Sequence, residues 1–255
     1  MINIPYLTPG LFYATIFCFV LAGCSETKTQ QNSEADSKNQ LSLQEIEDGW
    51  KLLFDGESTE HWRGYNMEEF PEAGWTAKDG LLVFRPPESD EWTSGLDIIT
   101  QDIFSDFEFK IDWMIERSGN SGIFYHVLEQ DRAIYWSGPE MQILDNENHP
   151  DAGQGVDGNR KAGSLYDLIP ADPQNTNPFG EWNSVKIVSN GPVIEHWQNG
   201  EKVLEYERWN QEWFDMLHDS KFRCYPEFGA MQQGHIGLQD HGDVIKFRNI
   251  KIREL

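Results

Sequence analysis

A two-residue alternation of apolar and mostly polar side chains constrains this chain more than any other feature. The stretch FEFKIDWMI, residues 107–115, places Phe, Phe, Ile, Trp and Ile at every second position. Successive side chains of a β-strand point to opposite faces of a sheet, whereas a helix repeats every 3.6 residues. The alternation therefore predicts a long strand with one face buried and the other facing solvent.

Two-residue turn sequences extend this prediction to hairpins. Asp79-Gly80 separates strands expected at 75–78 and 81–84, and Asn199-Gly200 separates strands expected at 193–198 and 201–206. The other predicted strands are 51–54, 96–100, 122–128, 140–144, 184–188, 235–239 and 244–252. A short amphipathic helix is expected around residues 209–217. The sequence contains neither a βαβ rhythm nor a long internal repeat, so it predicts an all-β domain, a two-sheet antiparallel β-sandwich of the jelly-roll type.

Charge and aromatic content narrow the class of partner. The 255 residues include 43 acidic and 20 basic side chains, for a formal net charge of −23. A surface this negative repels phosphate backbones, which argues against nucleic acid as a partner. The 10 Trp, 15 Phe and 8 Tyr residues are enough to build a folded core, so the acidity is not a sign of disorder.

The N-terminus has the features of an export signal. Residues 11–22 form an apolar run that ends in Leu21-Ala22-Gly23-Cys24, which resembles a bacterial lipobox. No Lys or Arg precedes the run, so an uncleaved apolar leader is the alternative. We predict a lipoprotein signal peptide at 1–23, a polar tether at 24–44 starting from lipidated Cys24, and a β-domain at 45–255. The protein is then exported and held in the bacterial cell envelope, periplasm or outer membrane, through its lipid anchor only.

An ordered series of motifs resembles a known family. The series is GNSGIFY (119–125), PEMQILD (139–145), GSLYDL (163–168), GEWN (180–183), IEHWQNG (194–200), GHIGLQDHG (234–242) and FRNIKI (247–252). Together these segments resemble the 3-keto-disaccharide hydrolase family, formerly a domain of unknown function. The resemblance implies a concanavalin A-like lectin/glucanase fold and action on glycosides whose C3 hydroxyl has been oxidised to a ketone. The family includes hydrolases and lyases, so the resemblance does not fix the reaction.

The segment from Glu140 to Asp145 is the predicted centre of the chemistry. On a strand, Glu140 and Gln142 share one face while Met141 and Ile143 turn into the core. The pattern resembles the Glu-x-Asp-x-x-Glu strand of laminarinase-like glucanases, with an amide at the middle position. A retaining glycosidase needs two carboxyl groups about 5–5.5 Å apart, and Gln142 cannot be one of them. The amide therefore argues against ordinary retaining hydrolysis.

A 3-keto-glycoside requires other groups. Its ketone acidifies the C2 proton, so a base, a group that stabilises the enolate and an acid for the C1 leaving group are sufficient. Glu140, Asp145 and His241 are the predicted catalytic residues, His241 because imidazoles exchange protons near neutral pH. The cofactor is not fixed by the sequence. One hypothesis is a single divalent metal ion held by Glu140, His149 and His196 and acting as a Lewis acid.

The substrate-binding predictions combine amides with aromatic rings. Amide and phenol groups can bind sugar hydroxyls, and aromatic faces can stack on sugar rings. The predicted binding residues are Asn120, Tyr125, Gln142, Tyr166, Trp182 and Gln239. Two alternatives to a 3-keto-glycoside enzyme stay open: a non-catalytic, lectin-like surface lipoprotein, and a glycosidase acting on unoxidised glycans.

Overall fold

The structure is a computed structural model that describes residues 1–2, 38–88 and 95–255. The predicted signal peptide, Cys24 and most of the predicted tether lie outside the described residues. Within the described ranges, no helix has both the length and the apolar character needed to cross a bilayer.

One compact unit extends from Lys38 to Leu255 and so begins before the predicted boundary at residue 45. The earlier start has a local cause. The Asn39 backbone N–H donates to Asn249 Oδ1 at 2.8 Å, and the Asn249 N–H donates to Asn39 Oδ1 at 2.8 Å. This reciprocal pair fixes residues that composition alone assigns to the tether.

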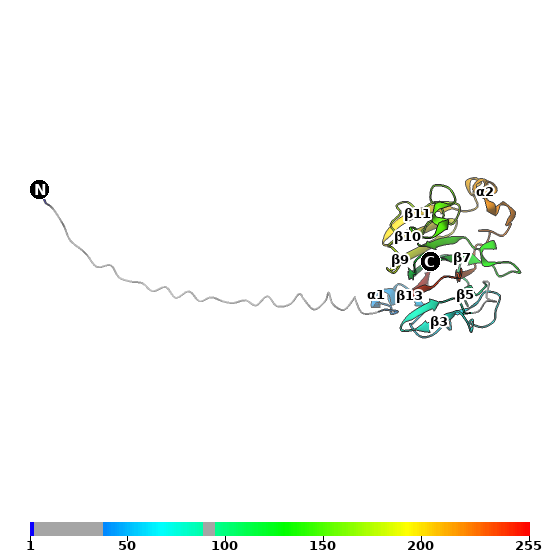
Figure 1. The fold of residues 1–255 in the computed structure, drawn as a ribbon, viewed down its shortest axis with the longest axis horizontal. Coiled ribbons are helices and arrows are strands. Elements are labelled where there is room, and N and C mark those ends of the chain that lie inside the picture. The colour runs from blue at the N-terminus through cyan, green and yellow to red at the C-terminus, as the bar shows by residue number, and fades with distance from the viewer. Residues whose placement is uncertain (3–37, 89–94) are drawn as a thin grey trace. The chain divides into compact units, whose positions relative to one another are not determined.

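The unit is built almost entirely from strands (Figure 1). Its strands are β1 (Lys51–Leu52), β2 (Trp62–Gly64), β3 (Trp75–Lys78), β4 (Leu81–Phe84), β5 (Ile98–Thr100), β6 (Phe107–Ile115), β7 (Asn120–Val127), β8 (Glu140–Leu144), β9 (Asn183–Asn190), β10 (Val193–Gln198), β11 (Glu201–Glu207), β12 (His235–Leu238) and β13 (Ile245–Glu254). Its helices are α1 (Leu43–Glu47), α2 (Gln211–His218) and the 3-10 turns η1 (Ile134–Trp136), η2 (Pro150–Gly153) and η3 (Lys221–Cys224).

The described strands form two antiparallel sheets. The first has the order β11-β10-β9-β6-β13-β4-β3, with β1 paired to β13, and the second has the order β2-β5-β12-β7-β8. This confirms the predicted all-β class and the two-sheet antiparallel sandwich of jelly-roll type. The predicted hairpin turns are also present, because Asp79 and Gly80 have φ of 54° and 75°, and Asn199 and Gly200 have φ of 50° and 83°.

The core lies between the two sheets, and β6 illustrates how it forms. Phe107, Phe109 and Trp113 on β6 are each at most 1% exposed, and they belong to one buried cluster with Ile123 of β7 and Met141 of β8. The alternation read from the sequence thus supplies the inner face of the first sheet. The unpredicted strand β2 has only three residues and pairs only with β5, so it is too short to show an alternation.

Candidate active site

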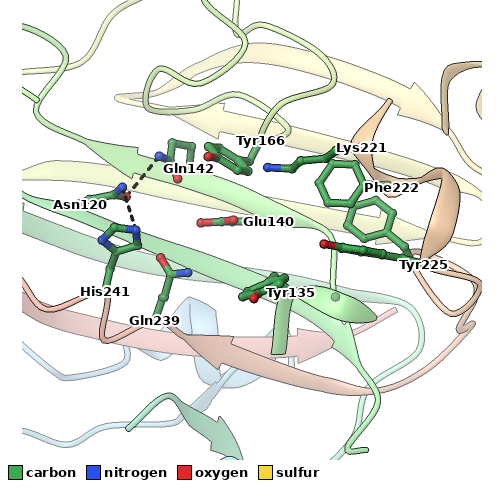
Figure 2. Close-up of a pocket in the computed structure, with 12 residues that line it drawn as sticks. Asn120, Tyr135, Glu140, Gln142, Tyr166, Lys221, Phe222, Tyr225, Gln239 and His241 are labelled. Atoms are coloured by element: carbon green, nitrogen blue, oxygen red, sulfur yellow. Dashed lines mark hydrogen bonds between the residues drawn. The ribbon is translucent and has the colours of Figure 1, made fainter. Parts of the chain in front are cut away.

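A pocket of about 330 Å³ lies over β7 and β8, two neighbouring strands of the second sheet (Figure 2). Side chains from these strands, from the end of β12 and from three connecting segments line it. The lining residues are Asn120, Tyr135, Gly138, Glu140, Gln142, Tyr166, Lys221, Phe222, Tyr225, Phe228, Gln239 and His241. Six of the predicted site residues are therefore in one place: Asn120, Glu140, Gln142, Tyr166, Gln239 and His241.

Strand alternation and register explain why Glu140 and Gln142 meet β7 on the pocket side. Gly122 pairs with Gln142 and Phe124 pairs with Glu140, so Glu140 and Gln142 share a face with alternate residues of β7. Gly122 makes room for the carboxyl group, because a Cβ atom there would lie only 2.1 Å from Glu140 Oε1. The glycine therefore lets the Glu140 side chain lie flat across β7.

The buried carboxyl is the most perturbed acid of the pocket lining. Burial raises the pKa of Glu140 to about 8, and the Lys221 ammonium opposes that rise. The carboxylates of Asp97 and Asp151 add to it by like-charge repulsion. A carboxyl with this pKa is a strong base once ionised and holds a proton readily near neutral pH.

Two amides lead from β8 to a histidine. Gln142 Nε2 donates to Asn120 Oδ1 at 3.2 Å, and Asn120 Nδ2 lies 3.2 Å from His241 Nε2 (Figure 2). His241 follows β12 in a turn with φ of 24°. The next acidic residue, Asp243, accepts the Asn120 backbone N–H at 3.0 Å and so fixes this turn against the start of β7.

The opposite wall of the pocket was not predicted from the sequence. It comes from η1 and from the segment after α2, where Lys221, Phe222, Tyr225 and Phe228 enter the pocket. Phe222 stacks on Phe228 with centroids 3.9 Å apart, and Tyr225 stacks on Trp136 at 3.9 Å. These contacts make a rigid aromatic wall. The only sequence signal for it is the density of aromatics between 222 and 228, which lacks the periodicity of a strand or a helix.

Lys221 is the one Lys or Arg side chain among the lining residues. Its Nζ lies 3.3 Å from Asp167 Oδ2 and 4.1 Å from the centroid of the Tyr166 ring. The Tyr166 hydroxyl in turn donates to Asp151 Oδ2 at 2.9 Å. Tyr166 lines the pocket as predicted, but an ammonium group lies over its ring. Its clearest role is thus to position Lys221.

Figure 2 shows that the pocket has two chemically different ends. Asn120, His241 and Gln239 gather at one end, and Phe222 and Tyr225 stand at the other, with the Glu140 carboxyl between them. Gln239 Oε1 is buried and has no hydrogen-bond partner among the described residues, so the polar end offers a free acceptor. One end can thus bind hydroxyl groups, while the other can pack against an apolar ring face.

Two predicted residues lie in the core instead of the pocket. The hydroxyl of Tyr125 lies 3.0 Å from His196 Nε2 and 2.6 Å from the Tyr206 hydroxyl, and all three side chains are buried. His196 Nδ1 lies 3.0 Å from the Gly163 carbonyl oxygen. Alternation explains the correction for Tyr125, which points with Ile123 to the face of β7 opposite Asn120 and Gly122.

Asp145 and Trp182 are also absent from the pocket lining. Asp145 accepts hydrogen bonds from the Ser118 backbone at 2.8 Å and from Asn148 Nδ2 at 2.9 Å. Burial alone would raise the pKa of Asp145, but these bonds lower it overall. The carboxylate therefore organises the loop after β8. Trp182 lies outside the pocket with the Arg248 guanidinium 3.9 Å from its ring centroid.

The predicted metal ligands do not converge. Both ring nitrogens of His196 already face partners in the core, and His149 Nδ1 accepts the Asp151 N–H at 3.1 Å. Across residues 38–88 and 95–255, no group of three or more His, Cys, Asp or Glu side chains is arranged to hold a metal ion. The set Glu140, His149 and His196 thus does not fit a metal ion.

The β-sandwich thus holds a buried carboxyl, clustered amides and an aromatic wall around one pocket, groups that suit sugar binding and acid–base chemistry. The chain belongs to the 3-keto-alpha-glucoside-1,2-lyase-like domain family, whose sequence model matches residues 49–253. It is a carbohydrate hydrolase or lyase of that family.

Known proteins that resemble this chain agree with the assignment. A 3-keto-disaccharide hydrolase from Bacteroides thetaiotaomicron is 41% identical over 91% of this chain and 86% of its own length. A "putative glycosyl hydrolase" of known structure from Parabacteroides distasonis is 32% identical, with a TM-score of 0.79 over 86% of this chain and all of its own. A second one from the same organism is 29% identical, with a TM-score of 0.60 over 81% of this chain.

Proposed function

We propose that this protein cleaves glycosides that carry a ketone at C3, starting with removal of the C2 proton by Glu140. The observation that carries the proposal is the single buried carboxyl of the pocket lining, which has no second carboxyl beside it on the strand. One base is enough when a ketone acidifies the neighbouring C–H, whereas retaining hydrolysis of a plain glycoside uses two carboxyl groups. The name of the Bacteroides relative supports the same substrate class.

Lys221 is the proposed stabiliser of the enolate. Removal of the C2 proton places negative charge on the C3 oxygen, and a fixed cation lowers the energy of that charge. Lys221 fits this role because its ammonium group enters the pocket from the wall opposite β8, held between Asp167 and the Tyr166 ring. Its charge also acts on the carboxyl of Glu140, whose pKa it lowers.

His241 is the proposed acid for the oxygen that leaves C1. It lines the polar end of the pocket and lies next to Asn120. In the first half of the reaction Glu140 takes the C2 proton, His241 gives a proton to the leaving oxygen, and the C1–O bond breaks. Water then adds at C1, His241 recovers a proton from it, and Glu140, whose proton has meanwhile exchanged with solvent, protonates C2. The net reaction is hydrolysis, and release of the unsaturated ketosugar before the second half is the lyase outcome.

The test is turnover of matched substrates by the purified folded domain. We expect cleavage of a 3-keto-disaccharide and none of the same disaccharide with its C3 hydroxyl intact. Chromatography of both reactions gives the answer directly. Cleavage of only the unoxidised sugar would contradict the proposal, and binding of the ketosugar without any turnover would favour the lectin-like alternative.

We also propose that the enzyme is exported and attached to the cell envelope through acylated Cys24. The apolar run that ends in Leu21-Ala22-Gly23-Cys24 supports this. Metabolic labelling with a tagged fatty acid tests it, with Cys24→Ser as the variant and Cys18→Ser as the matched control. Label that is retained in Cys24→Ser would contradict the proposal.

A further inference from the structure

The connection between β8 and β9 turns back on itself and pairs with β8. Among the described strands β8 is the last of its sheet, so one of its edges is left without a partner strand there. The Tyr166 N–H donates to the Glu140 carbonyl oxygen at 3.0 Å, and the Gln142 N–H donates to the Ser164 carbonyl oxygen at 3.0 Å. These bonds satisfy backbone groups of the open edge. They also place Tyr166, and with it Asp167, next to the strand residue that carries the buried carboxyl.

Arg160 lies in the same connection and binds two of its carboxylates. Its Nε donates to Asp167 Oδ1, and its Nη1 donates to Asp151 Oδ1 at 2.7 Å. The three side chains are between 12% and 21% exposed, so solvent screens their charges less than it screens those of a surface pair. A guanidinium group carries several N–H donors in a fixed plane, which lets one arginine join two acids. Arg160 therefore fixes Asp167 relative to the η2 turn that carries Asp151.

Asp167 is shared between two cations. Its Oδ1 accepts the bond from Arg160, and its Oδ2 lies 3.3 Å from Lys221 Nζ. The two oxygens of a carboxylate are held in one plane, so a bond that fixes one oxygen also fixes where the other points. Lys221 itself is 40% exposed and belongs to η3 on the opposite wall. Its long side chain has many rotamers when free, and the contact with Asp167 limits them.

The Tyr166 ring is a second support for Lys221, and it depends on the same arginine. Lys221 Nζ lies 4.1 Å from the ring centroid, and the Arg160 guanidinium lies 5.5 Å from it. The Tyr166 hydroxyl donates to Asp151 Oδ2 at 2.9 Å, while Arg160 holds the other oxygen of that carboxylate. Both groups that hold Lys221 are therefore fixed by Arg160.

Arg160 also changes how much of the Lys221 charge is available in the pocket. Among the described residues, Asp167 forms ion pairs with Arg160 and Lys221 and with no other cation. While Arg160 is present, the charge of the carboxylate is divided between two positive groups. Without Arg160, Lys221 would be its one counterion and would be drawn toward it. An ammonium group paired in that way is less able to stabilise negative charge on a ligand.

We propose that Arg160, which does not line the pocket, is a positioning residue that directs the Lys221 ammonium group at the ligand through Asp167. Arg160 touches no reacting atom. It fixes the Asp167 carboxylate and takes up part of its charge, so Lys221 is held at the pocket with part of its own charge unpaired. What that charge meets rests on the proposed function, in which it is the enolate oxygen at C3.

A purely structural role for Arg160 is the alternative, in which the ion pairs only hold the connection together. The two roles differ in whether the effect of Arg160 requires Lys221. A double-mutant cycle on a 3-keto-disaccharide separates them, with kcat and KM measured for Arg160→Met, Lys221→Met and the double variant. We expect Arg160→Met to lower kcat about tenfold and to change KM less than about twofold. In Lys221→Met, which alone should lower kcat about 100-fold, the same change should have no further effect.

Two further variants control for charge and for the loss of an ion pair. Arg160→Lys keeps the charge but has one ammonium group in place of the planar fork, so it should recover only part of kcat. Arg253→Met removes an arginine that pairs with Glu108 at 2.7 Å in the first sheet, outside the pocket lining, and should leave kcat unchanged. If Arg160→Met fails to fold, Asp167→Asn keeps the shape of the acid and should likewise lower kcat only when Lys221 is present.

Crystal structures of the unaltered protein and of Arg160→Met give a readout that needs no turnover. In the variant, Lys221 Nζ should leave its place over the Tyr166 ring and move toward Asp167. An unmoved ammonium group would overturn the proposal. So would a loss of kcat from Arg160→Met that is equally large with Lys221 and without it. Absence of turnover on every ketosugar would instead reject the proposed function and leave the structural comparison to decide.

Discussion

Strands β6 and β8 lie in different sheets of the same sandwich and use burial in opposite ways. Along β6, buried residues alternate strictly with half-buried ones, whereas all five residues of β8 are buried. The second face of β8 is covered by the pocket wall, yet two of its three side chains, Glu140 and Gln142, are polar. Burying polar groups is costly unless they are paired or used. The comparison teaches that β6 serves stability, while the polar face of β8 serves chemistry.

Phe109→Ala on β6 should give the largest effect. Phe109 is fully buried in the core, and removing its ring should lower the free energy of unfolding by about 3–5 kcal/mol. The activity per folded molecule should change little, because the residue is not among those that line the pocket. Urea unfolding monitored by tryptophan fluorescence measures the loss. Met114→Ala, on the other face of the same strand, is the control and should cost less than about 1 kcal/mol.

Gly122→Ala, next to β8, should lower activity while the fold stays intact. A methyl group at this position would lie within 2.1 Å of Glu140 Oε1, so the carboxyl must move. A displacement of about 1 Å of a reacting group costs about 100-fold in rate, and we expect kcat/KM to fall by about that factor. Circular dichroism should show an intact fold. Gly153→Ala, where a Cβ atom meets nothing within 4 Å, should be neutral.

The pH dependence of stability should also differ between a variant in β8 and a variant in β6. The pKa of Glu140 is raised from 4.5 to about 8 by burial, so the folded protein keeps a proton that the unfolded chain has lost. This contribution to stability is complete below the unfolded pKa and is lost as the pH rises through the folded pKa. Relative to the unaltered protein, Glu140→Gln should gain about 1.4 kcal/mol per pH unit between pH 5 and 8. Glu108→Gln on β6 is the control. If the free energy of unfolding changed with pH equally in both variants, the difference between the two strands would be disproved.

Trp182→Phe should give the smallest effect. Trp182 precedes β9 of the first sheet and packs against Arg248 outside the pocket lining. We expect KM to change by no more than about twofold. A large rise in KM, measured beside Tyr166→Phe in the pocket, would return Trp182 to the binding site where the sequence had placed it.

Most of the fold could be predicted because it depends on local patterns. The alternation at 107–115 and the turns at Asp79-Gly80 and Asn199-Gly200 specify strands and hairpins without knowledge of their neighbours. The strand half of the pocket could be predicted for the same reason, since alternation places Glu140 and Gln142 on one face.

The rest of the site depends on contacts between distant segments. Lys221 and Tyr225 lie in and after the turn η3, and nothing in their spacing shows that they pack over β8. Tyr125 and His196 looked suitable by residue type, but their burial against Tyr206 depends on how the two sheets pack. Trp182 lies outside the pocket against Arg248, a residue that follows much later in the chain.

The central claim is that Glu140 removes the C2 proton of a 3-keto-glycoside, and exchange in deuterated water tests it most directly. A 3-keto-disaccharide cleaved in D₂O should yield a ketosugar with deuterium at C2, detected by mass spectrometry. Glu140→Gln should lose both the exchange and the cleavage by about 10²–10⁴-fold, while Glu108→Gln retains both. Cleavage by the unaltered enzyme without deuterium at C2, or exchange that persists in Glu140→Gln, would contradict the account.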